Sequence, residues 1–123
     1  MHSDELLDHF RNPRNVGELA PPAITVESTN PACGDILRLS MLLENGIIHD
    51  IRFKASGCVA SIACGSALTE LIKDRTLTDA MRITSSQIDA CVGTLPQASR
   101  HAATLAQDAL KLLLKSASDA AGK

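Results

Sequence analysis

Four residues whose side chains commonly bind metals stand in three separate parts of the sequence. Cys33 and Asp35 lie two residues apart, on either side of a glycine. Cys58 follows the next strand-like stretch, and His101 opens the last helical one. Thiolate, carboxylate and imidazole groups form a workable ligand set for zinc or iron. The sequence therefore raises the hypothesis of a single metal site, provided that the fold brings these parts together.

The elements next to the two cysteines are expected to bring them close. Strand-like alternation covers residues 36–43 and 47–55, and Asn45-Gly46 between them is the strongest short signal for a tight hairpin turn. The outer ends of two strands joined by such a turn lie side by side. Because Cys33 and Cys58 flank those outer ends, hairpin geometry alone predicts that they meet.

The local chemistry around these cysteines also suits a metal. Gly34 permits a close approach of the backbone to an ion. Cys58 follows Gly57 and precedes a helical pattern, and the partial positive charge of a helix N-terminus stabilises a thiolate. The competing interpretation is that each cysteine is a small buried hydrophobe and that His101 is an ordinary half-exposed side chain. The residues by themselves leave both interpretations open.

The periodicity of the chain predicts strands first and helices after. The expected elements are a helix at 4–10 capped by Ser3, strands at 24–30, 36–43 and 47–55, a helix at 61–74, two short helices opened by Thr76 and Thr84, and a helix at 100–115. Along these elements we expect Ile47 and Leu112 to face inward and Ile48 to face outward. The prediction is one α+β domain over residues 1–123, with helices packed on one face of a small three-stranded antiparallel sheet and a frayed tail at 116–123.

The composition limits the classes of function. Apolar residues make up 45% of the chain and aromatic residues only 2%, which argues against a nucleic-acid surface built from stacking aromatics. The net charge of −2 gives no electrostatic case for binding nucleic acid or acidic membranes. No apolar run approaches the roughly 20 residues that span a bilayer, and the acidic, helical residues 1–10 do not resemble a signal peptide. We therefore expect a cytoplasmic location.

The four cysteines are expected to be reduced in that compartment. We therefore interpret them as metal ligands, reactive thiols or core residues in preference to disulfide partners. None of them forms a C-x-x-C pair. Cys64 lies six residues after Cys58, where a helix has rotated it off the direction of Cys58, so we expect it to pack in the core. Cys91 is likewise expected to be structural. A redox or sulfur-transfer protein that pairs Cys58 with either of them ranks last among the hypotheses.

These motifs together resemble the iron–sulfur cluster scaffold family, which comprises IscU and the N-terminal domain of NifU. The resemblance covers about residues 4–115 and is carried by Asp8 to Gly17, Ala32 to Asp35, Gly57 to Ala63, Leu68 to Lys73, Leu95-Pro96 and His101. It implies a non-enzymatic scaffold on which iron and sulfide are assembled into a [2Fe–2S] cluster. It further implies that a cysteine desulfurase supplies the sulfur and that acceptor proteins receive the cluster.

Carried over from the family, the cluster-binding residues are Cys33, Cys58 and His101, and Asp35 completes the metal ligands. The family has a third cysteine at the position of Ala102, whose methyl group can neither bind metal nor carry a persulfide. The family's Leu-Pro-Pro-Val-Lys segment for chaperone recognition reads Leu-Pro-Gln-Ala-Ser at residues 95–99 here. The resemblance therefore does not carry chaperone binding over to this chain.

Two functions follow from this ligand set. The first is a working scaffold, in which Cys33, Asp35, Cys58 and His101 supply two ligands to each iron of the cluster. The second is a zinc- or iron-binding homologue without assembly activity, since four ligands also suit a closed tetrahedral zinc site. Such a protein would bind or regulate the cysteine desulfurase. The sequence does not decide between them, nor between a monomer and a homo-oligomer.

Overall fold

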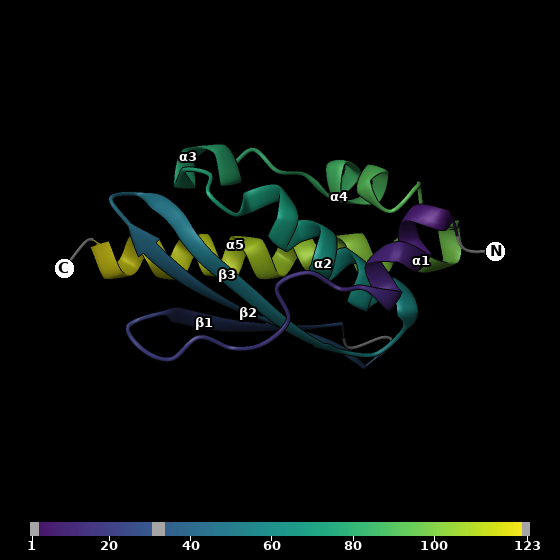
Figure 1. The fold of residues 1–123 in the computed structure, drawn as a ribbon, viewed down its shortest axis with the longest axis horizontal. Coiled ribbons are helices and arrows are strands. Elements are labelled where there is room, and N and C mark those ends of the chain that lie inside the picture. The colour runs from purple at the N-terminus through teal and green to yellow at the C-terminus, as the bar shows by residue number, and fades with distance from the viewer. Residues whose placement is uncertain (1–2, 31–33, 122–123) are drawn as a thin grey trace.

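The structure, a computed structural model, describes residues 3–30 and 34–121 of the chain (Figure 1). Its elements are α1 (Asp4–Arg11), β1 (Ile24–Asn30), β2 (Asp35–Glu44), β3 (Ile47–Ser56), α2 (Val59–Ile72), α3 (Leu77–Ala80), α4 (Ser85–Cys91), the 3₁₀ turn η1 (Gln97–Ser99) and α5 (His101–Ala121). The predicted N-caps are confirmed, because the side chains of Ser3, Thr76 and Thr84 each accept a hydrogen bond from the first turn of the following helix.

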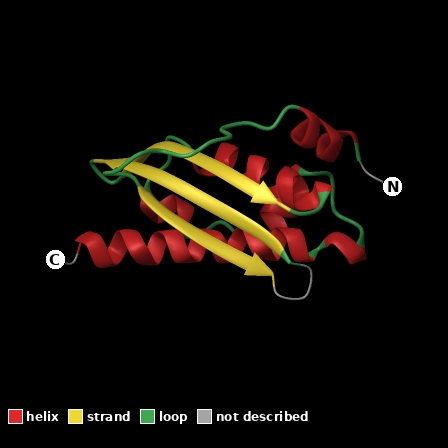
Figure 2. Cartoon of the chain, turned by 90° about the horizontal axis from the view of Figure 1, so that it is seen from below, coloured by secondary structure: helices red, strands yellow, loops and turns green. Residues whose placement is uncertain are grey.

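The three strands form an antiparallel sheet in the order β1-β2-β3 (Figure 2). Asn45 and Gly46 connect β2 to β3 with φ angles of 54° and 77°, as a two-residue hairpin turn requires. The predicted hairpin is thus confirmed. At its open end Ile36 pairs with Ser56, so the first residues of β2 lie beside the last residue of β3. This end of the sheet carries Asp35 and leads, just beyond Ser56, to Cys58.

The two longest helices cover one face of the sheet, which confirms the predicted α+β fold (Figures 1 and 2). Helix α5 packs against β1 and β2, and α2 packs against β3. Helices α1 and α4 in turn pack against α2, so α2 is enclosed on most of its surface. The core between these layers is aliphatic and rich in alanine, and Phe53 is the aromatic residue buried in it.

The free edge of β3 is covered by the connection that follows α1. The backbone N–H of Phe53 donates to the carbonyl of Asn15, and the N–H of Gly17 donates to the carbonyl of Phe53, each over 2.9 Å. This pairing satisfies edge groups that would otherwise be open to another strand. Within the described residues, no helix combines the length and apolar character that crossing a membrane needs.

Three local expectations were wrong. Ile47 is exposed and Ile48 is fully buried, because the β2–β3 register shifts between Leu42 and Leu43 and leaves His49 as an extra residue in β3. Such a bulge reverses the inward and outward alternation beyond it. Leu112 is 42% exposed rather than inward.

The end of the last helix was also predicted wrongly. In place of a helix that stops at Lys115 and a frayed tail from residue 116, α5 continues to Ala121. The reason lies in packing, since Ala117 is 2% exposed and belongs to the core. The buried side chain of Ala117 thus holds this part of the helix against the core.

Candidate metal centre

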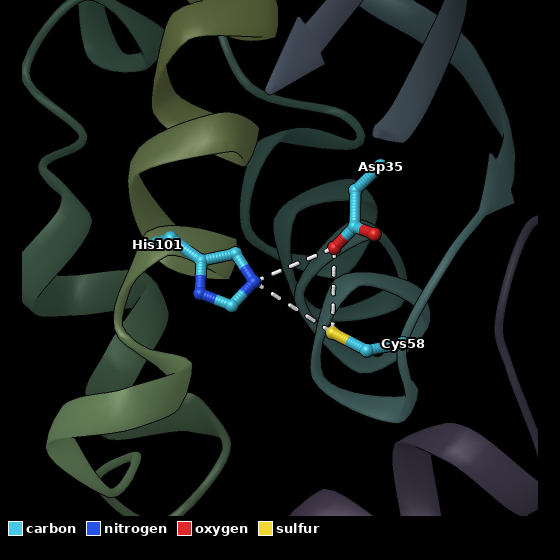
Figure 3. Close-up of side chains that lie close together, drawn as sticks. All are labelled: Asp35, Cys58 and His101. Atoms are coloured by element: carbon cyan, nitrogen blue, oxygen red, sulfur yellow. Dashed lines mark hydrogen bonds and ion pairs between the residues drawn. The ribbon is translucent and has the colours of Figure 1, made fainter. Parts of the chain in front are cut away.

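Asp35, Cys58 and His101 bring their ligand atoms within 4.8 Å of one another at the open end of the hairpin (Figure 3). The sulfur of Cys58 lies 3.4 Å from Oδ2 of Asp35 and 3.9 Å from Nε2 of His101. Nε2 of His101 lies 3.4 Å from Oδ2 of Asp35. A carboxylate, a thiol and an imidazole thus converge, and zinc and iron both accept these donors.

Each of the three residues stands at the end of an element. Asp35 is the first residue of β2, Cys58 is the N-cap of α2, and His101 is the first residue of α5. The hairpin places the first two side by side, and the packing of α5 on the sheet brings the third to them. The structure therefore brings together three of the four predicted ligands. The fourth, Cys33, lies outside the described residues.

The carboxylate of Asp35 is buried and strongly hydrogen-bonded. The hydroxyl of Ser61 donates to its Oδ2 over 2.6 Å. This bond, followed by the contacts with Cys58 and His101, lowers the pKa of Asp35 below its ordinary value of 3.8, although burial opposes the shift. At neutral pH the group is therefore an ionised carboxylate, the form that binds a metal.

The imidazole of His101 is oriented by the backbone of η1. Its Nδ1 lies 3.2 Å from the carbonyl oxygen of Ala98. Because a carbonyl can only accept a hydrogen bond, this contact places the ring proton on Nδ1. Nε2, the other ring nitrogen, faces Cys58 and Asp35, which is the arrangement of a metal-binding histidine held by an outer partner.

Cys58 differs from the other two described cysteines in its exposure. Cys58 is exposed, whereas Cys64 is fully buried and Cys91 is half-buried. Burial, followed by the nearby carboxylate of Asp89, raises the pKa of Cys64 to about 12. Burial, followed by Glu70, also raises the pKa of Cys91. The predicted core packing of Cys64 is confirmed, and these protonated thiols argue against a redox pair with Cys58.

Sequence reasoning did not predict the contacts of Ser61. This residue lies in the first turn of α2, and its side chain is enclosed between Asp35 and Cys58. The available signal was its spacing, because a residue three positions after an N-cap folds back toward that cap. Ala102, beside His101, is 1% exposed and lies in the core.

A second polar cluster joins α1 to α2 and was also not predicted. Nδ1 of His9 lies 2.8 Å from the hydroxyl of Ser66, which also accepts a hydrogen bond from the backbone N–H of Arg14 over 2.9 Å. Nε2 of His9 lies 3.4 Å from the carboxylate of Glu70. Burial, followed by the charge of Arg14, lowers the pKa of His9 below 6.5. This neutral histidine anchors the first helix to the core helix.

Comparison with known proteins identifies similar chains. Residues 1–119 match the family described as the NifU-like N-terminal domain. The iron–sulfur cluster assembly scaffold protein IscU of Azotobacter vinelandii is 42% identical over 118 residues, or 93% of this chain and 91% of that protein. The scaffold protein IscU 1 of Archaeoglobus fulgidus is 39% identical over 111 residues, or 90% of this chain and 72% of that protein.

Two solved structures share the fold. The crystal structure of a hypothetical protein has a TM-score of 0.75 at 28% identity, covering 90% of this chain and 94% of that one. The SUF-system protein FiSufU of Fervidobacterium islandicum also has a TM-score of 0.75, at 19% identity, covering 92% of this chain and 96% of that one. At that identity the second likeness concerns the fold alone.

Proposed function

Because the chain belongs to the NifU-like N-terminal domain family, we propose that it is a non-enzymatic iron–sulfur cluster assembly scaffold. In this proposal iron and sulfide are its cargo, held as a [2Fe–2S] cluster and then passed to acceptor proteins. The observation that carries the proposal is the convergence of Asp35, Cys58 and His101 within 4.8 Å. Relatives named as scaffolds match almost the whole chain, which supports the same reading.

The donor atoms suit a cluster that is held and then released. The thiolate of Cys58 is a strong ligand for iron, while the carboxylate of Asp35 is a harder and weaker one. A neutral imidazole from His101 in place of a thiolate makes a cluster easier to reduce. Cys33, two residues before Asp35 in the sequence, is the fourth proposed ligand. Four donors would supply two ligands to each iron.

The partners in this proposal follow from the chemistry of assembly. A cysteine desulfurase would deliver sulfur as persulfide, and Cys58 is the exposed thiol among the described residues that can receive it. Acceptor proteins would approach on the same side, since His101 is also partly exposed, at 27% of its side chain. We propose that the exchange takes place in the cytoplasm.

A second candidate function is supported by Ala102. With an alanine where the family has a third cysteine, the site offers four donors that suit a closed tetrahedral zinc or iron centre. A protein of this kind would keep its metal and would bind or regulate the desulfurase without assembling a cluster.

Anaerobic reconstitution with Fe²⁺ and sulfide, alone and with a cysteine desulfurase, tests the first function. A scaffold should develop cluster absorption, Cys58→Ala should abolish it, and Cys91→Ala should serve as a matched control that retains it. If the folded wild-type chain develops no cluster absorption, the scaffold proposal fails. Metal content after purification in chelator-free buffer then tests the second function, which a metal-free protein of unchanged stability contradicts.

The variant Ala102→Cys separates the two functions further. A large gain in cluster yield over wild type would show that the natural chain is impaired in assembly, as the second function requires. An unchanged yield, with a cluster formed in both chains, would show that the natural ligands suffice.

A further inference from the structure

We propose that Ser61 is a positioning residue of the metal centre, whose hydroxyl fixes the carboxylate of Asp35 so that Oδ2 faces the other ligands. The inference rests on the proposed metal-binding function. It adds a residue that binds no metal itself and acts through Asp35.

The contacts of Ser61 commit its only hydroxyl proton to Asp35. Ser61 is 1% exposed, and its Oγ lies 2.6 Å from Oδ2 of Asp35. A carboxylate accepts hydrogen bonds and cannot donate them, so the serine is the donor. A hydrogen bond of this length to an ionised acceptor is among the stronger kinds in proteins. The hydroxyl thereby fixes the position of Oδ2.

The same hydroxyl also lies beside the sulfur of Cys58. The Oγ of Ser61 is 3.4 Å from Sγ of Cys58, and the backbone N–H of Ser61 donates to the carbonyl of Cys58 over 3.1 Å. The first turn of α2 thus fixes the hydroxyl relative to the cysteine. Since that hydroxyl holds the carboxylate, the relative position of two ligands is set by a single buried side chain.

The opposite side of the carboxylate is bounded by Gly57. A Cβ at position 57 would overlap Oδ1 of Asp35, so this oxygen occupies space that only a glycine leaves free. The carboxylate is therefore held between a hydroxyl on Oδ2 and a bare backbone beside Oδ1. An oxygen of a carboxylate has two lone pairs, and the serine occupies one of those on Oδ2. The other can bind a metal, which favours a single metal–oxygen bond from Asp35.

Removal of the hydroxyl should free the carboxylate to rotate. The χ2 torsion of an aspartate has a broad distribution, so the contacts of the carboxylate decide which value it adopts. Without Ser61 the donors are less preorganised, and loss of an outer partner of a metal ligand typically costs about 10- to 100-fold in affinity. We expect a loss of this size for Ser61→Ala.

The test is an anaerobic titration of the reduced protein with Co²⁺, in which the visible d–d and charge-transfer absorption bands report binding. Ser61→Ala should weaken binding by about 10- to 100-fold and change the band pattern. Ser61→Thr and Ser61→Val have the same shape and differ in the hydroxyl, so Thr should bind more tightly than Val even if Ala does not fold. Ser66→Ala is the matched control, since it removes another buried hydroxyl of α2 that bonds His9 instead of a ligand.

A double-mutant cycle shows whether Ser61 acts through Asp35. In an Asp35→Ala background, Ser61→Ala should cause no further loss of Co²⁺ affinity. An additional loss there would overturn the inference, because it would mean that the hydroxyl acts by a route other than Asp35, such as its contact with Cys58. Equal affinities and spectra for wild type and Ser61→Ala would overturn the inference while the proposed function stands. A wild-type chain that binds no Co²⁺ would overturn both.

Discussion

Gly57 and Asp35 fit against each other at the open end of the hairpin, because a Cβ at position 57 would overlap the carboxylate of Asp35. The φ angle of Gly57 is +145°, a backbone conformation that residues with a side chain rarely adopt. Two independent constraints therefore require glycine immediately before Cys58. One concerns the turn into α2, and the other concerns the position of a proposed metal ligand.

Gly57→Ala should consequently lower both stability and metal affinity. The strained backbone is expected to cost about 1–3 kcal/mol of unfolding free energy, and the displaced carboxylate should weaken Co²⁺ binding. Gly46→Ala is a matched control at φ +77°, where a Cβ would meet nothing within 4 Å. The Gly46→Ala variant should lose about 1–2 kcal/mol of unfolding free energy and bind Co²⁺ with wild-type affinity. Urea unfolding and Co²⁺ titration measure the two effects, and normal affinity in Gly57→Ala would contradict the assignment.

Alkylation should separate Cys58 from Cys64 in the native protein. Cys58 is exposed, whereas Cys64 is fully buried with a pKa raised to about 12. Because the thiolate is the reactive form, iodoacetamide at pH 8 should modify Cys58 within minutes and leave Cys64 unmodified. Peptide mapping by mass spectrometry gives the extent at each site. Prior addition of Zn²⁺ should protect Cys58.

Modification in urea provides the control for that experiment, since both residues should then react. Equal native rates at Cys58 and Cys64 would mean that the first turns of α2 open on the time scale of labelling. Protection of Cys58 without any metal would instead contradict its exposure.

The stability of the fold should fall in mild acid because of His9. Burial lowers the pKa of His9 below 6.5, so the unfolded chain takes up this proton at a higher pH than the folded chain does. The contribution of neutral His9 to the stability of the fold is thus complete above pH 6.5 and is lost as the pH falls through the lowered pKa. The charged groups around it are Asp8, Arg14 and Glu70.

Urea unfolding at several values between pH 8 and pH 5 measures this dependence. His9→Gln should be less stable at pH 8, by about 1–3 kcal/mol for a disrupted buried hydrogen bond, and should show a smaller change with pH. His49→Gln is the control for the loss of an imidazole, because His49 is exposed on the hairpin, and it should keep the wild-type stability at pH 8. If the change of unfolding free energy with pH is the same in His9→Gln as in the wild type, the acid sensitivity belongs to other groups.

The sequence predicted those features that depend on neighbouring residues. The turn at Asn45-Gly46 and the caps at Ser3 and Thr84 are local signals, and each is present in the structure. The bulge at His49 was missed because alternation along one strand does not reveal an extra residue relative to its partner.

The site shows the same division between local and tertiary information. The meeting of Asp35 and Cys58 could be predicted because the hairpin that brings them together was recognisable in the sequence. The geometry of a hairpin is nearly fixed by its turn. The contact of Ser61 with Asp35 joins α2 to β2, and that of His9 with Ser66 spans 57 residues. Contacts of this kind depend on how the layers pack, which no short motif specifies.

Metal binding should stabilise the whole fold, since the three described residues of the proposed site, Asp35, Cys58 and His101, come from β2, α2 and α5. A metal that binds only the folded chain adds about 2.7 kcal/mol to the unfolding free energy at a free concentration of 100 times Kd. Zn²⁺ should therefore raise the melting temperature of the wild-type protein, and Cys91→Ala should respond equally.

Cys58→Ala should lose most of that increase, because it removes the sulfur that lies 3.4 Å from Oδ2 of Asp35 and 3.9 Å from Nε2 of His101. Thermal melts with and without Zn²⁺, each repeated after addition of a chelator, measure the difference. A full Zn²⁺-dependent increase in Cys58→Ala would locate the stabilising metal elsewhere. Since α5 also packs on β1 and β2 through the core, the apo protein should still unfold in one cooperative transition.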